Sequence, residues 1–208
     1  QIALRPLFFI LCLYYQELGI SLNYLPYVLL VLLFVSEMTD LFDGYVARRS
    51  NQVTDLGKVL DPMADSIFRL TVFFTFSQGI IQLPLWLVFL FFYRDSVISL
   101  LRTVCALRGL ALAARRSGKI KAVLQGTAGF VILLLMIPYS RGYLSLEQLR
   151  SYCFYIVLVT AIYTLYSGVE YIVANREFIL KASQPPIVRQ RRSKTHKAAG
   201  KSHSERSS

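Results

Sequence analysis

Two closely spaced pairs of aspartates give this sequence a group of side chains that could hold metal ions. Asp40 and Asp43 are three residues apart, and Asp61 and Asp65 are four apart. In a helix, either spacing places both carboxylates of a pair on one face. Four neighbouring carboxylates repel one another, and hard divalent cations, which prefer oxygen ligands, relieve that repulsion. The pairs therefore predict a site for Mg²⁺ or Mn²⁺.

Other interpretations of the aspartates have less support in the sequence. Both histidines, His196 and His203, lie in the polar C-terminal tail, and the three cysteines lie in apolar segments. A zinc site or a histidine base near the aspartates therefore has no candidate residues. The aspartates could instead cap helix ends beside Arg48 and Arg49, an explanation that suits one pair better than two.

The elements that must position these aspartates are predicted to be membrane-spanning helices. Of the 208 residues, 55% are hydrophobic, and the mean hydropathy is +0.49. Apolar runs that approach the roughly 20 residues needed to cross a bilayer lie at 2–15, 25–48, 61–78, 84–107, 120–139 and 149–173. We therefore expect an all-α, polytopic membrane protein with about six transmembrane helices around a cytosol-facing polar cavity. The first run is short and follows Gln1 directly, so we expect some of the native N-terminus to precede it.

The formal net charge of +11 raises the question of a nucleic-acid partner, but the basic residues are distributed as in a membrane protein. Nine of the 23 Lys and Arg lie in the polar tail, and most others lie at the ends of apolar runs. If the chain starts in the cytoplasm, the regions 44–60, 108–121 and 174–208 carry most of the positive charge, whereas the opposite loops carry Arg141 and Arg150. This asymmetry follows the positive-inside rule. It predicts no nucleic-acid partner and an active site that faces the cytosol, and we expect the membrane to be the bacterial cytoplasmic (inner) one.

The residues around the aspartates complete a longer pattern. Residues 40–65 fit D-x2-D-G-x2-A-R-x8-G-x3-D-x3-D, in which eight positions are specified. Gly44 and Gly57 leave room for close backbone approach, as a nucleotide between helices would require. Arg48 can bind a phosphate through both arms of its guanidinium, and Ala47 is small enough to pack between helices. Eight residues at fixed spacing rarely arise by chance, and through them the chain resembles the CDP-alcohol phosphotransferase family over nearly its whole membrane region.

The resemblance implies a transferase with a role for each of these residues. It implies a transmembrane domain over 1–175, and the polar sequence after it predicts a basic, disordered cytoplasmic tail over 176–208. In the family, two metal ions hold the diphosphate of a CDP-activated lipid such as CDP-diacylglycerol, and one aspartate is the general base for the acceptor alcohol. The matching metal ligands here are Asp40, Asp43, Asp61 and Asp65, and Asp65 matches the base. The matching CDP-lipid contacts are Asp40, Gly44, Arg48, Thr54 and Gly57. The family also commonly forms homodimers within the membrane lipids.

A second group of polar residues bears on the alcohol that accepts the phosphatidyl group. Arg94 and Arg102 are eight residues apart, close to one helical face, and intramembrane arginines often have functional roles. The stretch is similar to that of phosphatidylglycerophosphate synthases, R-[E/D]-x3-[S/T]-x2-R followed by G-K-x-K-T-x2-Q, which implies glycerol 3-phosphate as the acceptor. The residues that would contact its phosphate are Arg94, Ser99, Arg102, Lys119, Lys121 and Gln125. Ala122 departs from this pattern, because those enzymes usually have Thr there.

Several alternatives stay open from the sequence. The acceptor could be inositol phosphate, serine or phosphatidylglycerol, and aspartates within a membrane also occur in prenyltransferases and cation transporters. Lys119 and Lys121 could serve as ordinary anchors at the cytoplasmic rim, and Arg94 could pair with Asp95 or Glu170. A prenyltransferase or a transporter does not call for Arg48 beside the aspartates, so phosphatidyl transfer is the preferred hypothesis.

Overall fold

A computed structural model of the chain describes residues 4–49, 55–108 and 115–183. Within these ranges, the side chains of 4–5, 40–41, 43–49, 55–64 and 181–183 lie outside the description. The described residues form helices and no strands, which confirms the predicted all-α class. The helices are α1 (Leu4–Tyr14), α2 (Leu25–Arg49), α3 (Asp55–Gln78), α4 (Leu85–Leu107), α5 (Arg116–Ser140), α6 (Leu146–Ala174) and α7 (Arg176–Ser183).

The first six helices lie where the sequence predicts six apolar segments, and local chemistry explains several of their ends. Pro84 precedes α4, where its missing N–H costs no hydrogen bond. Ser145 caps α6: its hydroxyl accepts from the backbone N–H of Gln148 at 3.2 Å, and the Gln148 side chain accepts from the Ser145 N–H at 3.0 Å. Helix α3 begins at Asp55, six residues before the predicted start, because residues 55–60 are helix formers around a single glycine.

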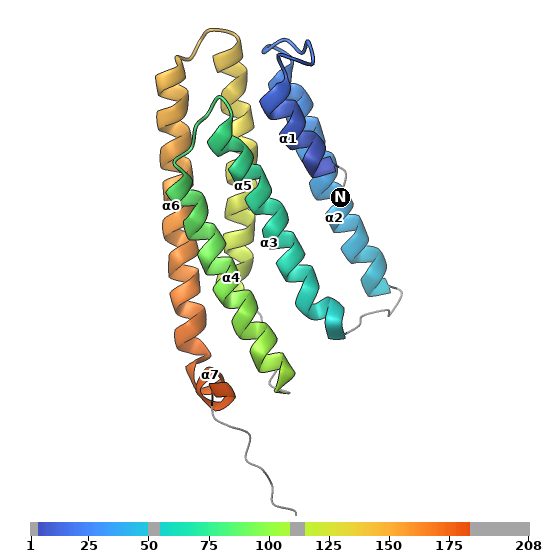
Figure 1. Cartoon of the computed structure of the whole chain (residues 1–208), viewed down its shortest axis with the longest axis vertical. Helices are drawn as coiled ribbons and strands as arrows, with labels where there is room; N and C mark the ends of the chain where they lie inside the picture. The colour runs from blue at the N-terminus through green and yellow to red at the C-terminus, as the bar shows by residue number, and fades with distance from the viewer. Residues whose placement is uncertain (1–3, 50–54, 109–114, 184–208) are drawn as a thin grey trace, which may run out of the picture.

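Helix α7 extends the described structure into the region that the sequence assigns to the tail. Its eight residues follow α6 directly after Asn175. It packs against α4 and α6 at one end of the bundle, at the lower end of α6 and beside the lower end of α4 in Figure 1. The first part of the predicted disordered tail is therefore helical, and residues 184–208 lie outside the described residues.

The helices run side by side as an elongated bundle (Figure 1). Helices α3 and α4 form one hairpin and α5 and α6 another, and both turns lie at the end of the bundle opposite α7. Aromatic packing fixes α3 against α4, with ring centroids of Phe73 and Phe91 5.0 Å apart and those of Phe74 and Phe89 6.4 Å apart. This apolar core holds the polar ends of α3 and α4 in a fixed relation.

The outer faces of the bundle are apolar as well. By length and composition, α5 and α6 qualify as membrane spans, and Leu25–Thr39 within α2 is a shorter apolar stretch. On α6, Val159, Ile162 and Val169 are each at least 60% exposed. A soluble monomer rarely exposes so many large apolar side chains in one place. The surface therefore agrees with a protein that lies in a membrane.

Candidate active site

A polar cavity of about 260 Å³ lies between the ends of α3, α4 and α5. Its lining residues are Asp65, Ser66 and Arg69 from α3; Arg94, Asp95, Ile98, Ser99 and Arg102 from α4; and Arg115, Gly118, Lys119, Lys121 and Ala122 at the start of α5. Six of these side chains carry a positive charge, and only Asp65 and Asp95 among them carry a negative one. The cavity therefore favours an anion.

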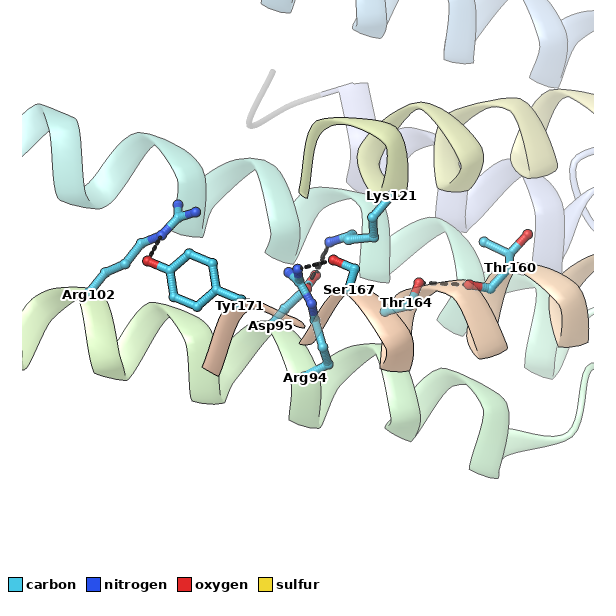
Figure 2. Close-up of polar contacts among 8 residues, drawn as sticks. All are labelled: Arg94, Asp95, Arg102, Lys121, Thr160, Thr164, Ser167 and Tyr171. Atoms are coloured by element: carbon cyan, nitrogen blue, oxygen red, sulfur yellow. Dashed lines mark hydrogen bonds and ion pairs between the residues drawn. The ribbon is translucent and has the colours of Figure 1, made fainter. Parts of the chain in front are cut away.

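Asp95 lies at the centre of a buried ion-pair network in the cavity wall (Figure 2). From α5, Lys121 Nζ donates to both carboxylate oxygens of Asp95 on α4, at 2.6 Å and 2.8 Å. Arg94 Nη1 donates to Asp95 Oδ1 at 3.0 Å. Asp95 is 5% exposed and Lys121 is 2% exposed, so each charge depends on the other for compensation.

Helix α6 contacts this network through Arg94. Arg94 Nη2 donates to the Ser167 hydroxyl at 2.6 Å (Figure 2). The Arg94 side chain also crosses α6 at Gly168, where a Cβ would lie only 2.9 Å from Arg94 Cγ. A glycine at 168 is thus what lets the guanidinium lie against α6. The position of Arg94 is therefore set by Asp95 on its own helix and by α6.

Two further arginines of the cavity are tied to α6. Arg102 Nε donates to the Tyr171 hydroxyl at 3.2 Å, and its guanidinium carbon lies 5.2 Å from the centre of the Tyr171 ring (Figure 2). Arg115 forms an ion pair with Glu170 at 3.0 Å, which joins the start of α5 to α6. Helix α6 therefore holds the cations of the cavity without lining it.

The sequence reasoning did not assign Ser167, Gly168 or Tyr171 to the site, and it considered Glu170 only as an arginine partner. A signal for them was present in the spacing of small and polar residues along an otherwise apolar helix. Thr160 and Thr164 begin this stripe, and each hydroxyl donates to the carbonyl four residues earlier, at 2.9 Å and 2.8 Å. Ser167 follows at the next turn and is fully buried. A buried polar stripe of this kind indicates a partner on a neighbouring helix.

The structure brings together most of the residues predicted to bind the acceptor. Arg94, Ser99, Arg102, Lys119 and Lys121 all line the cavity, and so does Asp65, which is exposed. The alternative in which Lys121 only anchors the chain to headgroups does not hold, because this side chain is buried on Asp95. The alternative that pairs Arg94 with Asp95 is confirmed, so Arg94 is engaged within the protein.

Gln125 differs from the other predicted acceptor residues. It is 2% exposed and lines a separate, much smaller pocket together with Glu37 and Arg69. Helix α5 turns by about 100° per residue, so Gln125, four residues after Lys121, lies roughly one turn deeper in the bundle than the cavity. The prediction that Gln125 contacts the acceptor therefore has no support from the cavity lining.

Three of the four aspartates and the predicted CDP contacts are placed only through their backbone. Asp40 and Asp43 lie in α2, and Asp61 and Asp65 lie in α3. The structure describes the side chain of Asp65, but not those of the other three aspartates. The same holds for Gly44 and Arg48 in α2 and Gly57 in α3, and Thr54 lies outside the described residues altogether. Among the described side chains, no three His, Cys, Asp or Glu gather as metal ligands would.

Comparison with known proteins gives a consistent result. Residues 1–163 match the family model described as CDP-alcohol phosphatidyltransferase. The CDP-diacylglycerol–glycerol-3-phosphate 3-phosphatidyltransferase of Bacillus subtilis is 32% identical over 183 residues, which cover 85% of this chain and 91% of that protein. The protein of the same name from Rickettsia typhi is 32% identical over 150 residues, 71% of this chain and 80% of that protein. A CMP-forming cardiolipin synthase of Streptomyces coelicolor is 38% identical, but over only 69 residues, 33% of this chain and 32% of that protein.

Proposed function

The chain belongs to the CDP-alcohol phosphatidyltransferase family, and on that premise we propose that it transfers the phosphatidyl group of CDP-diacylglycerol to sn-glycerol 3-phosphate. The products are phosphatidylglycerophosphate and CMP, so the reaction belongs to phospholipid biosynthesis. The observation that carries the choice of acceptor is the strongly cationic cavity beside Asp65. The relatives similar over most of this chain carry the name of the same reaction.

Charge complementarity supports a phosphate-bearing acceptor. The cavity lining has six cationic side chains against two carboxylates, so it would attract a small dianion such as glycerol 3-phosphate. The first turn of α5 adds to this, because Gly118 and Lys119 line the cavity and Arg115, the residue before the helix, makes no side-chain cap. Backbone N–H groups at such a helix start favour phosphate oxygens. Serine has no phosphate, and the phosphodiester of phosphatidylglycerol carries one negative charge, whereas the phosphate monoester of glycerol 3-phosphate carries up to two.

We assign the metal ligands as Asp40, Asp43, Asp61 and Asp65. The donor chemistry fits, because carboxylate oxygens are the ligands that Mg²⁺ and Mn²⁺ prefer. Asp65 is exposed to the cavity, and the other three lie on the same two helices. Two bound ions would supply charge neutralisation at the diphosphate of the CDP-lipid. Gly44, Arg48, Thr54 and Gly57, in and beside the same helices, would hold the CDP moiety.

The proposed chemical step is an in-line displacement at phosphorus. Asp65 accepts the proton of the primary hydroxyl of glycerol 3-phosphate, and the hydroxyl oxygen attacks the lipid-side phosphorus. The new P–O bond forms as the bond to the CMP phosphate oxygen breaks, and CMP leaves with that electron pair. The cationic wall of the cavity, which includes Arg102, Lys119 and Lys121, binds the acceptor phosphate. It thereby directs the acceptor hydroxyl toward Asp65.

The membrane arrangement is part of the proposal. We propose six transmembrane helices, α1 to α6, with the cavity open to the cytosol of a bacterium and the acyl chains left in the inner membrane. The apolar outer face of α6 and the composition of α5 and α6 support a bilayer location. Arg102, Arg115 and Lys119 line the end of the bundle near α7, as the positive-inside rule requires for a cytosolic end. We propose a homodimer, which the family resemblance favours.

An acceptor panel tests the function. Membranes or detergent-solubilised protein are incubated with CDP-diacylglycerol, Mn²⁺ and one labelled acceptor: glycerol 3-phosphate, inositol phosphate, serine or phosphatidylglycerol. We expect labelled phosphatidylglycerophosphate and stoichiometric CMP with glycerol 3-phosphate. Turnover with one of the other acceptors alone would overturn the assignment of the acceptor, and turnover with none would overturn the proposed reaction.

Replacing Arg102 by Ala is expected to raise the KM for glycerol 3-phosphate about tenfold or more, because a charge-assisted bond to phosphate is lost. The KM for CDP-diacylglycerol should stay within about twofold of the wild-type value, since the side chain lies on the acceptor side of the cavity. Arg141→Ala is the matched control: this arginine bonds Tyr27 at the other end of the bundle. A selective defect toward the CDP-lipid in the Arg102 variant would place Arg102 in the other subsite.

A further inference from the structure

We propose that Asp95 is a positioning residue for the acceptor, which acts by holding Lys121 as the cation that meets the acceptor phosphate. The inference rests on the proposed transfer to glycerol 3-phosphate. It divides the cations of the cavity into two kinds: Lys121 as a ligand, and Arg94 as part of the frame that holds Asp95. The network runs from α6 through α4 to α5 (Figure 2).

The burial of Lys121 is the first step in the argument. Only 2% of this residue is exposed, although it lines the cavity. A buried ammonium group is unfavourable without a counter-charge, and Asp95 provides one at 2.6 Å. An ammonium group has three N–H donors. Two of them meet the Asp95 oxygens, which leaves one for a ligand in the cavity.

The second step concerns Arg94, which is held inside the protein through two of its five N–H donors. Its Nη1 is bonded to Asp95 Oδ1 at 3.0 Å and its Nη2 to the Ser167 hydroxyl at 2.6 Å. Gly168 provides the space that this conformation needs. Asp95 Oδ1 accepts from both Arg94 and Lys121, so Arg94 fixes the carboxylate to which Lys121 is bonded.

The third step is a comparison with the other cations of the cavity. Arg102 bonds a neutral partner, the Tyr171 hydroxyl, and so keeps its full charge for a ligand. Arg115 pairs with Glu170 at a partly exposed position, where solvent weakens the interaction. Asp95 is the buried carboxylate of the cavity lining. By bonding two N–H donors of Lys121, it fixes the direction of the third. Removing the charge of Asp95 should therefore weaken binding of the acceptor phosphate more than binding of the CDP-lipid.

Asp95→Asn tests the inference. We expect the KM for glycerol 3-phosphate to rise at least about tenfold, because Lys121 loses its counter-charge and its orientation. The KM for CDP-diacylglycerol and the Mn²⁺ concentration for half-maximal activity should stay within about twofold of wild type. Glu147→Gln, at an exposed position in the first turn of α6, is the matched carboxylate-to-amide control.

A double-mutant cycle separates positioning from a general structural role. Lys121→Met should raise the acceptor KM, and adding Asp95→Asn to Lys121→Met should raise it by no more than about twofold further, since Asp95 acts through Lys121. Lys121→Met leaves Asp95 paired with Arg94, so this variant should fold even if Asp95→Asn does not. It therefore keeps the inference testable, because its acceptor KM should still rise.

Three results would overturn the inference. The first is an unchanged acceptor KM in Asp95→Asn, the second is an equal defect toward both substrates, and the third is a multiplicative effect in the double variant. A wild-type protein that does not use glycerol 3-phosphate would overturn the proposed function itself, together with this inference. Wild-type transfer with a failed Asp95 test would leave the proposed function standing.

Discussion

Asp65→Asn is expected to abolish phosphatidyl transfer, with a loss of at least about 100-fold in kcat. The amide has nearly the shape of the carboxylate but cannot accept the proton of the acceptor hydroxyl. Asp65 is exposed to the cavity, so the substitution leaves no buried charge unpaired and the fold should be retained. Activity is measured as CMP release under saturation with both substrates, and the fold by thermal melting in detergent.

Binding of the CDP-lipid separates loss of the base from loss of the site. The Asp65→Asn variant should still bind CDP-diacylglycerol in the presence of Mn²⁺, because three other carboxylates of the proposed site stay in place. Glu17→Gln, exposed between α1 and α2, is a control for removal of one carboxylate and should keep wild-type activity. Near-normal turnover in Asp65→Asn would remove the role of Asp65 as general base.

Chelation of divalent cations is expected to reduce transfer by more than about 100-fold, because the diphosphate and the four carboxylates would then repel one another. Dialysis against EDTA followed by addition of Mg²⁺ or Mn²⁺ should restore activity. EDTA that is saturated with Mg²⁺ beforehand should have no effect, which controls for the chelator itself.

The aspartates themselves provide a second measurement for the metal assignment. Asp61→Asn should raise the Mn²⁺ concentration for half-maximal activity, whereas Glu17→Gln should not. Full activity in EDTA, or an unchanged Mn²⁺ dependence in the Asp61 variant, would contradict the assignment of the aspartates as metal ligands. A shift in the Mn²⁺ dependence alone, without a shift in the acceptor KM, would separate the metal site from the cationic wall of the cavity.

The proposed site has a cationic half and an aspartate half, and they rest on different observations. The cationic half is described down to individual donor–acceptor distances, such as the 2.6 Å between Lys121 and Asp95. The aspartate half is placed by the backbone of α2 and α3 and by the Asp65 side chain. The acceptor proposal thus rests on the charges and internal contacts of the cavity side chains and on the relatives, whereas the metal proposal rests on the motif and on family membership.

The bounds of the helices could be predicted from the sequence because they depend on local chemistry. Continuous apolar runs set the length of α2 to α6, and residues such as Pro84 and Ser145 mark their starts. The start of α3 was missed because the prediction followed the apolar run, whereas the helix formers Leu56, Lys58 and Leu60 lie before that run. Helix α7 was missed because it lies in polar sequence, and it is held by its packing against α4 and α6.

The sequence by itself determined the candidate residues for the chemistry. The fixed spacing of Asp40, Asp43, Asp61 and Asp65 is a property of the chain, and so is the excess of basic residues at one end of the apolar runs. Spacing also placed Arg94 and Arg102 near one face of α4. Such inferences hold because they depend only on helical periodicity and on charge.

Only the tertiary structure decided which partner each charge has. Lys121 could have faced headgroups, and Gln125 could have faced the cavity, until α5 was packed against α6, α2 and α3. Lys121 and Asp95 are 26 residues apart, and Arg94 and Ser167 are 73 apart. No local pattern specifies contacts at such distances along the chain. They arise because a buried charge must find a counter-charge wherever neighbouring helices present one.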